Sequence, residues 1–478
     1  MTVPVGEMPQ RRIGPIRLVP GVRPAQVALF VMVVIGALCV VTFLPMMQAV
    51  VFTEILDVPR AEQGRLAGNL VTTQQLAVLC FIGLAGSLAD RLGRRRILAV
   101  ALGGYALCMA LYPLASGVAA LYLLQFCFGL MTTGHITGSA TIIADYPDDA
   151  SRGKFVAANL LLQAALSAVL VGWVGARLPG WLVAGGATPG EAGRLAFWSV
   201  AGVALCAAIA TWLWLEDPPR RGAIPPATVS AGTPGTRPGV ARSALRGFLD
   251  NLARVIAHGR RNPRFGLVMT MGFVIRSDYF VMLSFVSLWV VNAAAEKGVS
   301  SIEALKTAGL LMLTLKLATA AAQAVFGFVA DRVERSRLLV TSLLLTGLSL
   351  VSTALVSDVF SVAMFVVVAV IGITESALIV CGQTMLGAEA PPELRGSAMG
   401  VFYFTGTLGV VIMSAVSGLL FDRIGYSAPF VMIGLLNLVF AMLGAAKLWR
   451  DPAPAPPSSA RSGSGVDRAS TAKRLPDS

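Results

Sequence analysis

Four charged residues lie inside long apolar stretches of the sequence. Arg276 and Asp278 interrupt the run from Phe265 to Val291, while Lys316 and Glu375 lie inside two later runs. A charge near the centre of a bilayer costs about 2.5 to 3.5 kcal/mol on insertion scales, so each should be paired or line a wet cavity. Buried carboxyl groups can exchange protons, and cations can bind anions. The four residues therefore predict either proton exchange with binding of a charged solute, or two static salt bridges between helices.

The composition explains why these charges must lie within a membrane. The chain has 478 residues, of which 56% are hydrophobic and only 13% are charged. Twelve apolar runs of about 18 to 25 residues recur along it, the length needed to cross a hydrocarbon core of about 30 Å. The sequence therefore predicts an all-α membrane protein with twelve transmembrane helices.

The distribution of Lys and Arg predicts the orientation. With an even number of spans both termini lie on one side, and most of the 38 Lys and Arg residues fall in the loops of that side. The loops of the opposite side hold Arg60, Arg65, Arg177, Arg194, Lys297, Lys306 and Arg423. By the positive-inside rule both termini are cytoplasmic. The net charge of +13 thus needs no nucleic acid to explain it.

Metal, cofactor and enzyme chemistry are not expected. The six cysteines all fall in apolar runs without a C-x-x-C pair, and the only histidines are His135 and His258. These residues offer neither a zinc site nor a disulfide framework. The sequence has no clustered nucleophile and no P-loop glycine pattern, which argues against an enzyme and against ATP-driven transport.

An internal repeat divides the chain. The stretch "GSLADRLGRRRIL" from Gly86 recurs as "GFVADRVERSRLL" from Gly327, about half the chain later. A second pair, "ADYPDDASRGK" from Ala144 and "AEAPPELRGSA" from Ala388, has nearly the same separation. Two matching separations indicate duplicated halves of six helices each, related by pseudo-two-fold symmetry.

The repeat and the composition predict five segments. Residues 1–24 form a cytoplasmic segment, 25–215 a six-helix bundle, 216–263 a cytoplasmic linker, 264–449 a second bundle and 450–478 a disordered cytoplasmic tail. The linker begins Pro- and Gly-rich and then keeps Leu245, Phe248, Leu249, Leu252, Val255 and Ile256 at helical spacing. We expect this part to be an amphipathic helix on the membrane surface.

In these features the chain resembles the major facilitator superfamily (MFS) of secondary transporters, in its bacterial type. Twelve spans in two halves and "GSLADRLGRRR" after the second span carry the resemblance, which covers roughly residues 24–449. The signature residues in the first copy are Gly86, Asp90, Arg91, Gly93, Arg94 and Arg95, and those in the second are Gly327, Asp331 and Arg332. Glu334 stands where the second copy would have its second glycine. The resemblance implies the inner membrane as location and a conformational latch between Asp90 and the eleventh span, which would begin near Arg395 and Gly396.

The duplication also matches polar residues at equal depth. From Lys316 to Gly327 the helix would rise about 16 Å, half the hydrocarbon thickness, so Lys316 lies near the midplane. The repeat places Lys316 opposite Gln75, beside Gln74, and places Glu375 next to the position of His135. Two repeats that face one central cavity would show this pattern, with substrate bound near the midplane.

Helix geometry limits which charges act together. Positions two apart on a helix point about 200° from one another, so Arg276 and Asp278 cannot both face a cavity unless the helix is broken there. We favour Asp278 facing the cavity with Tyr279 nearby, and Arg276 facing a neighbouring helix or Glu375.

These residues predict a proton-coupled transporter of a small organic solute, anionic or zwitterionic, working by alternating access as a monomer in the lipid bilayer. Two alternatives stay open: a multidrug exporter and a lipid transporter or flippase of the same fold. Gln125 at the place of a common family arginine, and the absence of proline in "LLLQAALSAVLVGWVG", count against the drug exporter. Four buried charges count against a lipid substrate.

Overall fold

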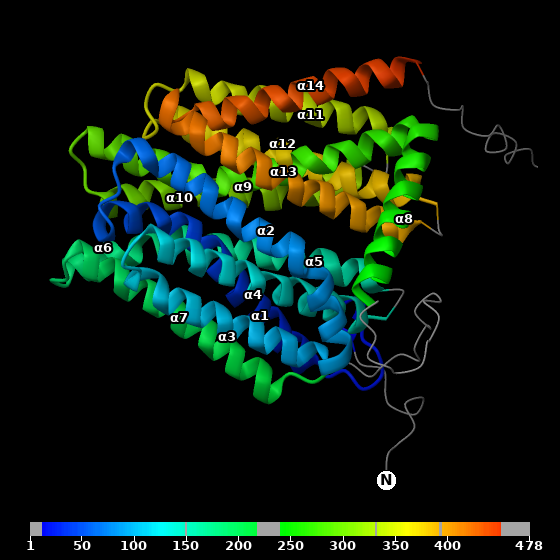
Figure 1. The fold of residues 1–478 in the computed structure, drawn as a ribbon, viewed down its shortest axis with the longest axis horizontal. Coiled ribbons are helices and arrows are strands. Elements are labelled where there is room, and N and C mark those ends of the chain that lie inside the picture. The colour runs from blue at the N-terminus through cyan, green and yellow to red at the C-terminus, as the bar shows by residue number, and fades with distance from the viewer. Residues whose placement is uncertain (1–11, 149–150, 218–239, 330–331, 392–393, 451–478) are drawn as a thin grey trace, which may run out of the picture.

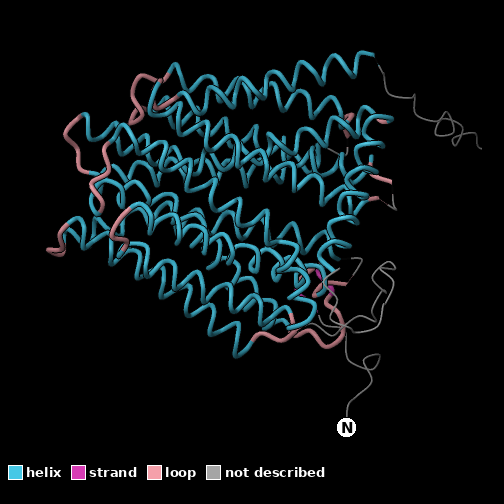
Figure 2. Tube along the Cα trace, in the orientation of Figure 1, coloured by secondary structure: helices cyan, strands magenta, loops and turns pink. Residues whose placement is uncertain are grey.

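The computed structural model is almost entirely helical, as an apolar chain in a bilayer must be, because a helix satisfies its own backbone hydrogen bonds. It describes residues 12–148, 151–217, 240–329, 332–391 and 394–450. A two-stranded ribbon, β1 (Arg12–Ile13) with β2 (Ile16–Arg17), precedes the first span (Figure 2). The described helices include twelve that are long and apolar enough to cross a membrane, which confirms the predicted number.

The first six spans occupy the first half of the described chain. They are α1 (Pro24–Val50) with η2 (Val51–Ile55), α2 (Arg60–Leu92), α3 (Arg94–Leu111) with η3 (Tyr112–Leu114), α4 (Val118–Asp145), α5 (Arg152–Ser167) with η5 (Ala168–Gly175) and α6 (Ala176–Ala184), and α7 (Pro189–Trp214).

The second half has the same number of spans after one surface helix, α8 (Val240–Arg261). They are α9 (Pro263–Glu296), α10 (Ser301–Val329), α11 (Arg335–Val351) with η6 (Ser352–Leu355), α12 (Val362–Glu389), α13 (Arg395–Arg423) and α14 (Ala428–Arg450).

The spans lie side by side along the long axis of the molecule, with the first half below and the second half above in Figure 1. We call the end where α1 begins and α14 ends the terminal face, and the opposite end, where α2 and α10 begin, the far face. Helix α8 crosses the terminal face (Figure 1). Its Val255 is 1% exposed and belongs to an apolar cluster with Phe265 and Val268 of α9, so α8 is packed against the second half.

Helices α1 and α9 are the most buried of the spans. Their apolar side chains meet in one cluster that contains Phe43 and Val50 of α1 and Phe285 and Trp289 of α9. Both helices therefore lie at the centre of the molecule, and the polar residues of α9 are correspondingly far from bulk solvent.

Candidate functional site

The two halves touch closely at the far face. In α2, Gly64 and Gly68 pack against Gly418 and the backbone of Ser414 in α13, at distances that leave no room for a Cβ atom. Glycines allow this approach because they have no side chain. Between η5 and α10, Gly172 and Gly309 make a second contact of the same kind. The π-helical turns of η5 are a local distortion of a kind common at functional sites.

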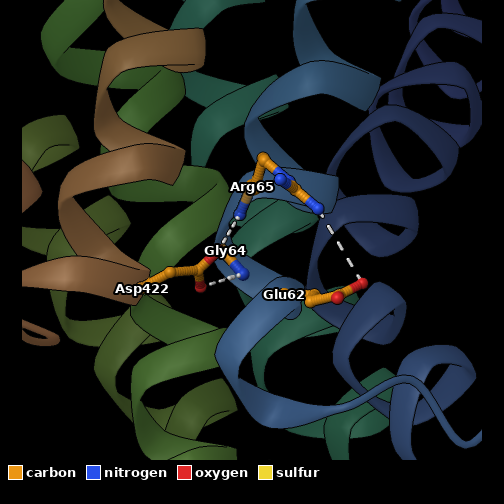
Figure 3. Close-up of polar contacts among 4 residues, drawn as sticks. All are labelled: Glu62, Gly64, Arg65 and Asp422. Carbon is orange, nitrogen blue, oxygen red and sulfur yellow. Dashed lines mark hydrogen bonds and ion pairs between the residues drawn. The ribbon is translucent and has the colours of Figure 1, made fainter.

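A carboxylate reinforces the far-face contact. Asp422 of α13 accepts hydrogen bonds from the backbone N–H groups of Gly64 (2.8 Å) and Arg65 (2.7 Å) near the start of α2 (Figure 3). The positive N-terminal end of a helix favours such an anion. Glu62 and Arg65 form an exposed ion pair beside it (Figure 3). Ser301 of α10 donates a hydrogen bond to Glu54 of η2, which gives a second polar link between the halves.

The same helices lack this packing near the terminal face. A Cβ atom would meet nothing within 4 Å at the glycines Gly83, Gly86, Gly153, Gly327 and Gly400 of α2, α5, α10 and α13. Toward this face, the last hydrogen bond described between α2 and α13 joins Thr72 to the carbonyl oxygen of Val411 (3.0 Å). Among the described residues, close glycine packing between the halves is thus confined to the far-face part of these helices.

Lys316 of α10 and Glu375 of α12 lie on two helices of the second half that pack against each other, and their charges interact without forming an ion pair. The Lys316 ammonium donates a hydrogen bond to the Tyr279 hydroxyl (2.8 Å) and lies 4.0 Å from the centre of that ring. Glu375 is 2% exposed, and its Oε1 atom has no hydrogen-bond partner. Lys316 is the cation that acts electrostatically on Glu375. The arrangement brings one half-buried cation and one buried carboxyl group together from α10 and α12.

Asp278 faces a neighbouring helix in this conformation, where we had expected it to face a cavity. It is 2% exposed, and both carboxyl oxygens accept hydrogen bonds from the Asn437 amide of α14, at 3.1 and 3.0 Å. An amide donor deep in the bundle satisfies a carboxyl group that would otherwise be unpaired. Asp278 still belongs to the charged group, because Glu375 is the carboxylate that acts on it electrostatically.

Arg276 points away from Asp278, as two positions on one helix must. Its side chain packs against Gly406 of α13, and its guanidinium lies 5.7 Å from the Phe280 ring. The Nε atom is buried without a hydrogen-bond partner. All four charged residues lie in the described part of the chain, and no ion pair joins any two of them, so the alternative of two static salt bridges does not hold in this conformation.

An amide network occupies the first half. Gln48 of α1 donates to Tyr112 (2.9 Å) and Gln125 (3.3 Å), and Gln125 donates to Gln74 of α2 (2.7 Å). The network ties α1, α2 and α4 together without a charge. The Gln74 side-chain oxygen is therefore already hydrogen-bonded to Gln125 in this conformation.

Gln75 and His135 each have an unused polar atom. The Gln75 side chain is 1% exposed, and its oxygen accepts no hydrogen bond. His135 lies 3.5 Å from the Tyr105 hydroxyl through Nδ1, while its Nε2 is buried without a partner. The structure does not bring these two residues into hydrogen-bond contact with the charged group of the second half.

The signature loop at the terminal face is held by acidic residues of the first half. Gly93 has φ +94°, a conformation that favours glycine. Arg94 pairs with Asp145 of α4. The backbone N–H of Arg95 donates a hydrogen bond to the Asp217 carboxylate (2.8 Å), and its guanidinium donates to the carbonyl oxygen of Leu215 (3.0 Å). Arg91 is exposed. The side chains of Asp90, Arg395 and Gly396 lie outside the described residues, so the implied latch stays a prediction.

The second copy of the loop uses its own acid. Glu334, in place of the second glycine, pairs with Arg264 of α9 (3.7 Å) and Arg337 of α11 (2.7 Å). Asp331 lies outside the described residues, and Arg332 is exposed. The second copy of the loop thus has a carboxylate of its own, that of Glu334, whereas the first copy is bound by the carboxylate of Asp217.

Two of these features were missed from the sequence. Asn437 is the only amide residue of the last span, and the same search for polar residues at membrane depth that found Glu375 would have found it. Asp422 lies at the end of a span, where acids are common, so only the contact with α2 distinguishes it.

Among the described residues, no group of three His, Cys, Asp or Glu residues could hold a metal ion.

Comparisons with known proteins agree on the family. The model of the Major Facilitator Superfamily matches residues 29–313 and 280–475. Magnetosome protein MamH of Paramagnetospirillum magneticum is 23% identical over 445 residues, covering 91% of this chain and 93% of the relative. Magnetosome protein MamZ of Magnetospirillum gryphiswaldense is 22% identical over 407 residues, covering 83% of this chain. The chain spans 58% and 62% of the length of the two MamZ relatives it matches.

Solved structures show the same fold. The nucleoside transporter NupG matches with a TM-score of 0.64 and 14% identity, over 88% of this chain and 98% of the other. A bacterial homologue of the human lysosomal transporter Spinster matches with a TM-score of 0.59 and 16% identity, over 89% and 96%. Because the family model matches most of the chain, this chain belongs to the Major Facilitator Superfamily, and its twelve long apolar helices make it a multi-pass membrane protein.

Proposed function

We propose that this protein moves a small anionic or zwitterionic organic solute across the bacterial inner membrane by proton-coupled alternating access. The observation that carries the proposal is the buried Glu375 carboxyl group, which has an unpaired oxygen beside the Lys316–Tyr279 pair. Leaving an ionised carboxylate buried without a partner costs several kcal/mol. Glu375 therefore carries a proton in this conformation or takes a cationic partner.

Lys316 is the partner that can change. While Glu375 is protonated, Lys316 is held by the Tyr279 hydroxyl and is available to a substrate anion. When Glu375 loses its proton, the ammonium moves from Tyr279 toward the carboxylate. The two arrangements place the Lys316 charge differently between α9, α10 and α12. Protonation of Glu375 therefore stabilises one conformation of these helices more than the other.

The anionic preference rests on the two cations. Neither Lys316 of α10 nor Arg276 of α9 has an ion-pair partner among the described residues, although α9 also carries Asp278 and α12 carries Glu375. Both carboxyl oxygens of Asp278 already accept hydrogen bonds from the Asn437 amide. An anionic group of the solute would satisfy a cation that the protein leaves unpaired.

The direction of opening follows from the far-face packing. Close packing of α2 on α13 and of η5 on α10 closes the far face. The glycines of these helices near the terminal face have no atom within 4 Å of a Cβ position. The positive-inside rule assigns the terminal face to the cytoplasm. The conformation then corresponds to the inward-open state of the transport cycle, and breaking the far-face contacts would give the outward-open state.

Transport in proteoliposomes tests the proposal. With an imposed pH gradient and a panel of carboxylates, amino acids, sugars and cationic drugs, we expect uphill accumulation of a carboxylate or zwitterion. Collapse of the gradient by a protonophore should reduce the internal concentration to that outside. Accumulation that is unchanged by the protonophore would contradict proton coupling, and uptake restricted to cationic drugs would contradict the substrate class.

A further inference from the structure

A groove opens between α8 and the second half, away from the charged group. It has a volume of about 670 Å³, within the usual range for small-molecule sites. Its described lining comes from α8, with Ile256 and Arg260, from α9, with Pro263 and Phe273, from α13, with Leu408, and from α14, with Lys447. Each helix contributes residues at helical spacing, so the groove follows the helices.

The wall of the groove is apolar and open. Ile256 is 47% exposed and Leu408 is 37% exposed, although both lie against the bundle. From Pro263 at the start of α9 to Phe273 the helix rises about 15 Å, which is half of a hydrocarbon core of about 30 Å. The groove thus has the depth of one membrane leaflet.

Its rim is basic. Arg260 lies next to the last residue of α8, and Lys447 lies near the end of α14, so both belong to the terminal face. Both side chains are exposed, and neither forms an ion pair with another described residue. Among the described residues of the lining there is no Asp or Glu. A positive rim above an apolar slot of leaflet depth is complementary to a molecule with one anionic end and a long hydrocarbon chain.

We propose that this groove binds one anionic phospholipid of the terminal-face leaflet. Its phosphate lies between Arg260 and Lys447, and one acyl chain lies along Phe273 and Leu408. Anionic lipids are enriched in cytoplasmic leaflets and are attracted by basic residues at the surface, which agrees with a terminal face on that side. The bound lipid would fill the space under α8 and hold this helix against α9 and α13.

Native mass spectrometry of the delipidated full chain tests the proposal. Titration with phosphatidylglycerol should give one tightly bound molecule, whereas phosphatidylcholine with the same acyl chains should bind more weakly. The double variant Arg260→Ala/Lys447→Ala should weaken phosphatidylglycerol binding about thirtyfold, because each basic residue contributes about fivefold. The control Arg96→Ala/Arg261→Ala removes two exposed terminal-face charges outside the groove and should bind as the parent does.

A second pair of variants tests the apolar part. Leu408→Trp should fill the groove and displace the lipid, while Leu435→Trp, at a residue of α14 that is 52% exposed and outside the groove, should not. Equal retention of phosphatidylglycerol in all four variants would overturn the proposal. Protection from thermal unfolding by inorganic phosphate alone, equal to that by the lipid, would assign the cations to a free anion instead. A protein dimer that dissociates only in the Arg260/Lys447 variant would identify a second copy of the chain as the occupant.

Discussion

Replacing Glu375 with glutamine should abolish uphill transport while leaving the protein folded. Glutamine keeps the size of the side chain but cannot release a proton, so Lys316 has no carboxylate to which it can move. For one coupled proton, a gradient of one pH unit supports at most about tenfold accumulation, because each unit stores about 1.36 kcal/mol. We expect the parent protein to approach this ratio in proteoliposomes and Glu375→Gln to reach a ratio of about one.

Substrate exchange separates loss of coupling from loss of folding. Glu375→Gln should still exchange labelled for unlabelled substrate at equal concentrations, since exchange requires no net proton movement. Asp358→Asn is the matched control, because it removes a carboxylate that pairs with Lys297 at the far face (2.9 Å), outside the bundle. This control should accumulate substrate as the parent does. Accumulation at the parent level by both Glu375→Gln and Asp278→Asn would refute the assignment of proton exchange to these carboxyl groups.

Replacing Asp422 with alanine should open the far face. The substitution removes both acceptors of the Gly64 and Arg65 N–H groups, and hydrogen bonds to a charged group contribute about 1.5 to 3 kcal/mol. A loss of about 2 kcal/mol changes the ratio of far-face-closed to far-face-open molecules about thirtyfold. The remaining glycine contacts of α2 with α13 are the same in both proteins.

Spin labels across the far face measure this change. Ala184 at the end of α6 and Ser357 between η6 and α12 belong to different halves, and both are exposed. Distance distributions between labels at these positions should gain a longer component in Asp422→Ala. The control Glu303→Gln removes an exposed far-face carboxylate that pairs with Lys306 of its own helix (3.7 Å), and it should match the parent. An unchanged distribution in Asp422→Ala would show that Asp422 does not hold the far face closed.

The membrane architecture could be predicted from the sequence because it depends on local properties. Apolar runs of bilayer length specify the spans, and the two copies of the G-x-x-x-D-R pattern specify the duplication. The helical rise likewise placed Lys316 at the depth of the other charges, and the structure brings it beside Glu375. The opposed directions of Arg276 and Asp278 also follow from the helix alone.

The partners of these residues could not be predicted, because they come from helices distant in the chain. Asp278 accepts its hydrogen bonds from Asn437, 159 residues later, and no spacing rule relates the two. In this conformation a single amide in α14 holds Asp278 at a helix interface instead of in the cavity. The far-face contact of Asp422 is likewise 358 residues from Gly64, so it depends on how the halves dock.

Glu334 illustrates a second limit. In the sequence it is a degraded signature position, since a glycine is expected there. In the structure its carboxylate pairs with Arg264 and Arg337, whereas the first copy receives the carboxylate of Asp217 from the end of α7. Both copies therefore place an acid near the start of the third helix of their half, but from different points of the chain.

Proton movement during downhill substrate entry tests the central claim most directly. Proteoliposomes containing a pH-sensitive dye, with no initial pH gradient, are given the substrate identified by the transport screen. We predict that the lumen acidifies as labelled substrate enters, and that Glu375→Gln shows no acidification above that of empty liposomes. Substrate entry through the parent protein without any change in internal pH would contradict proton coupling.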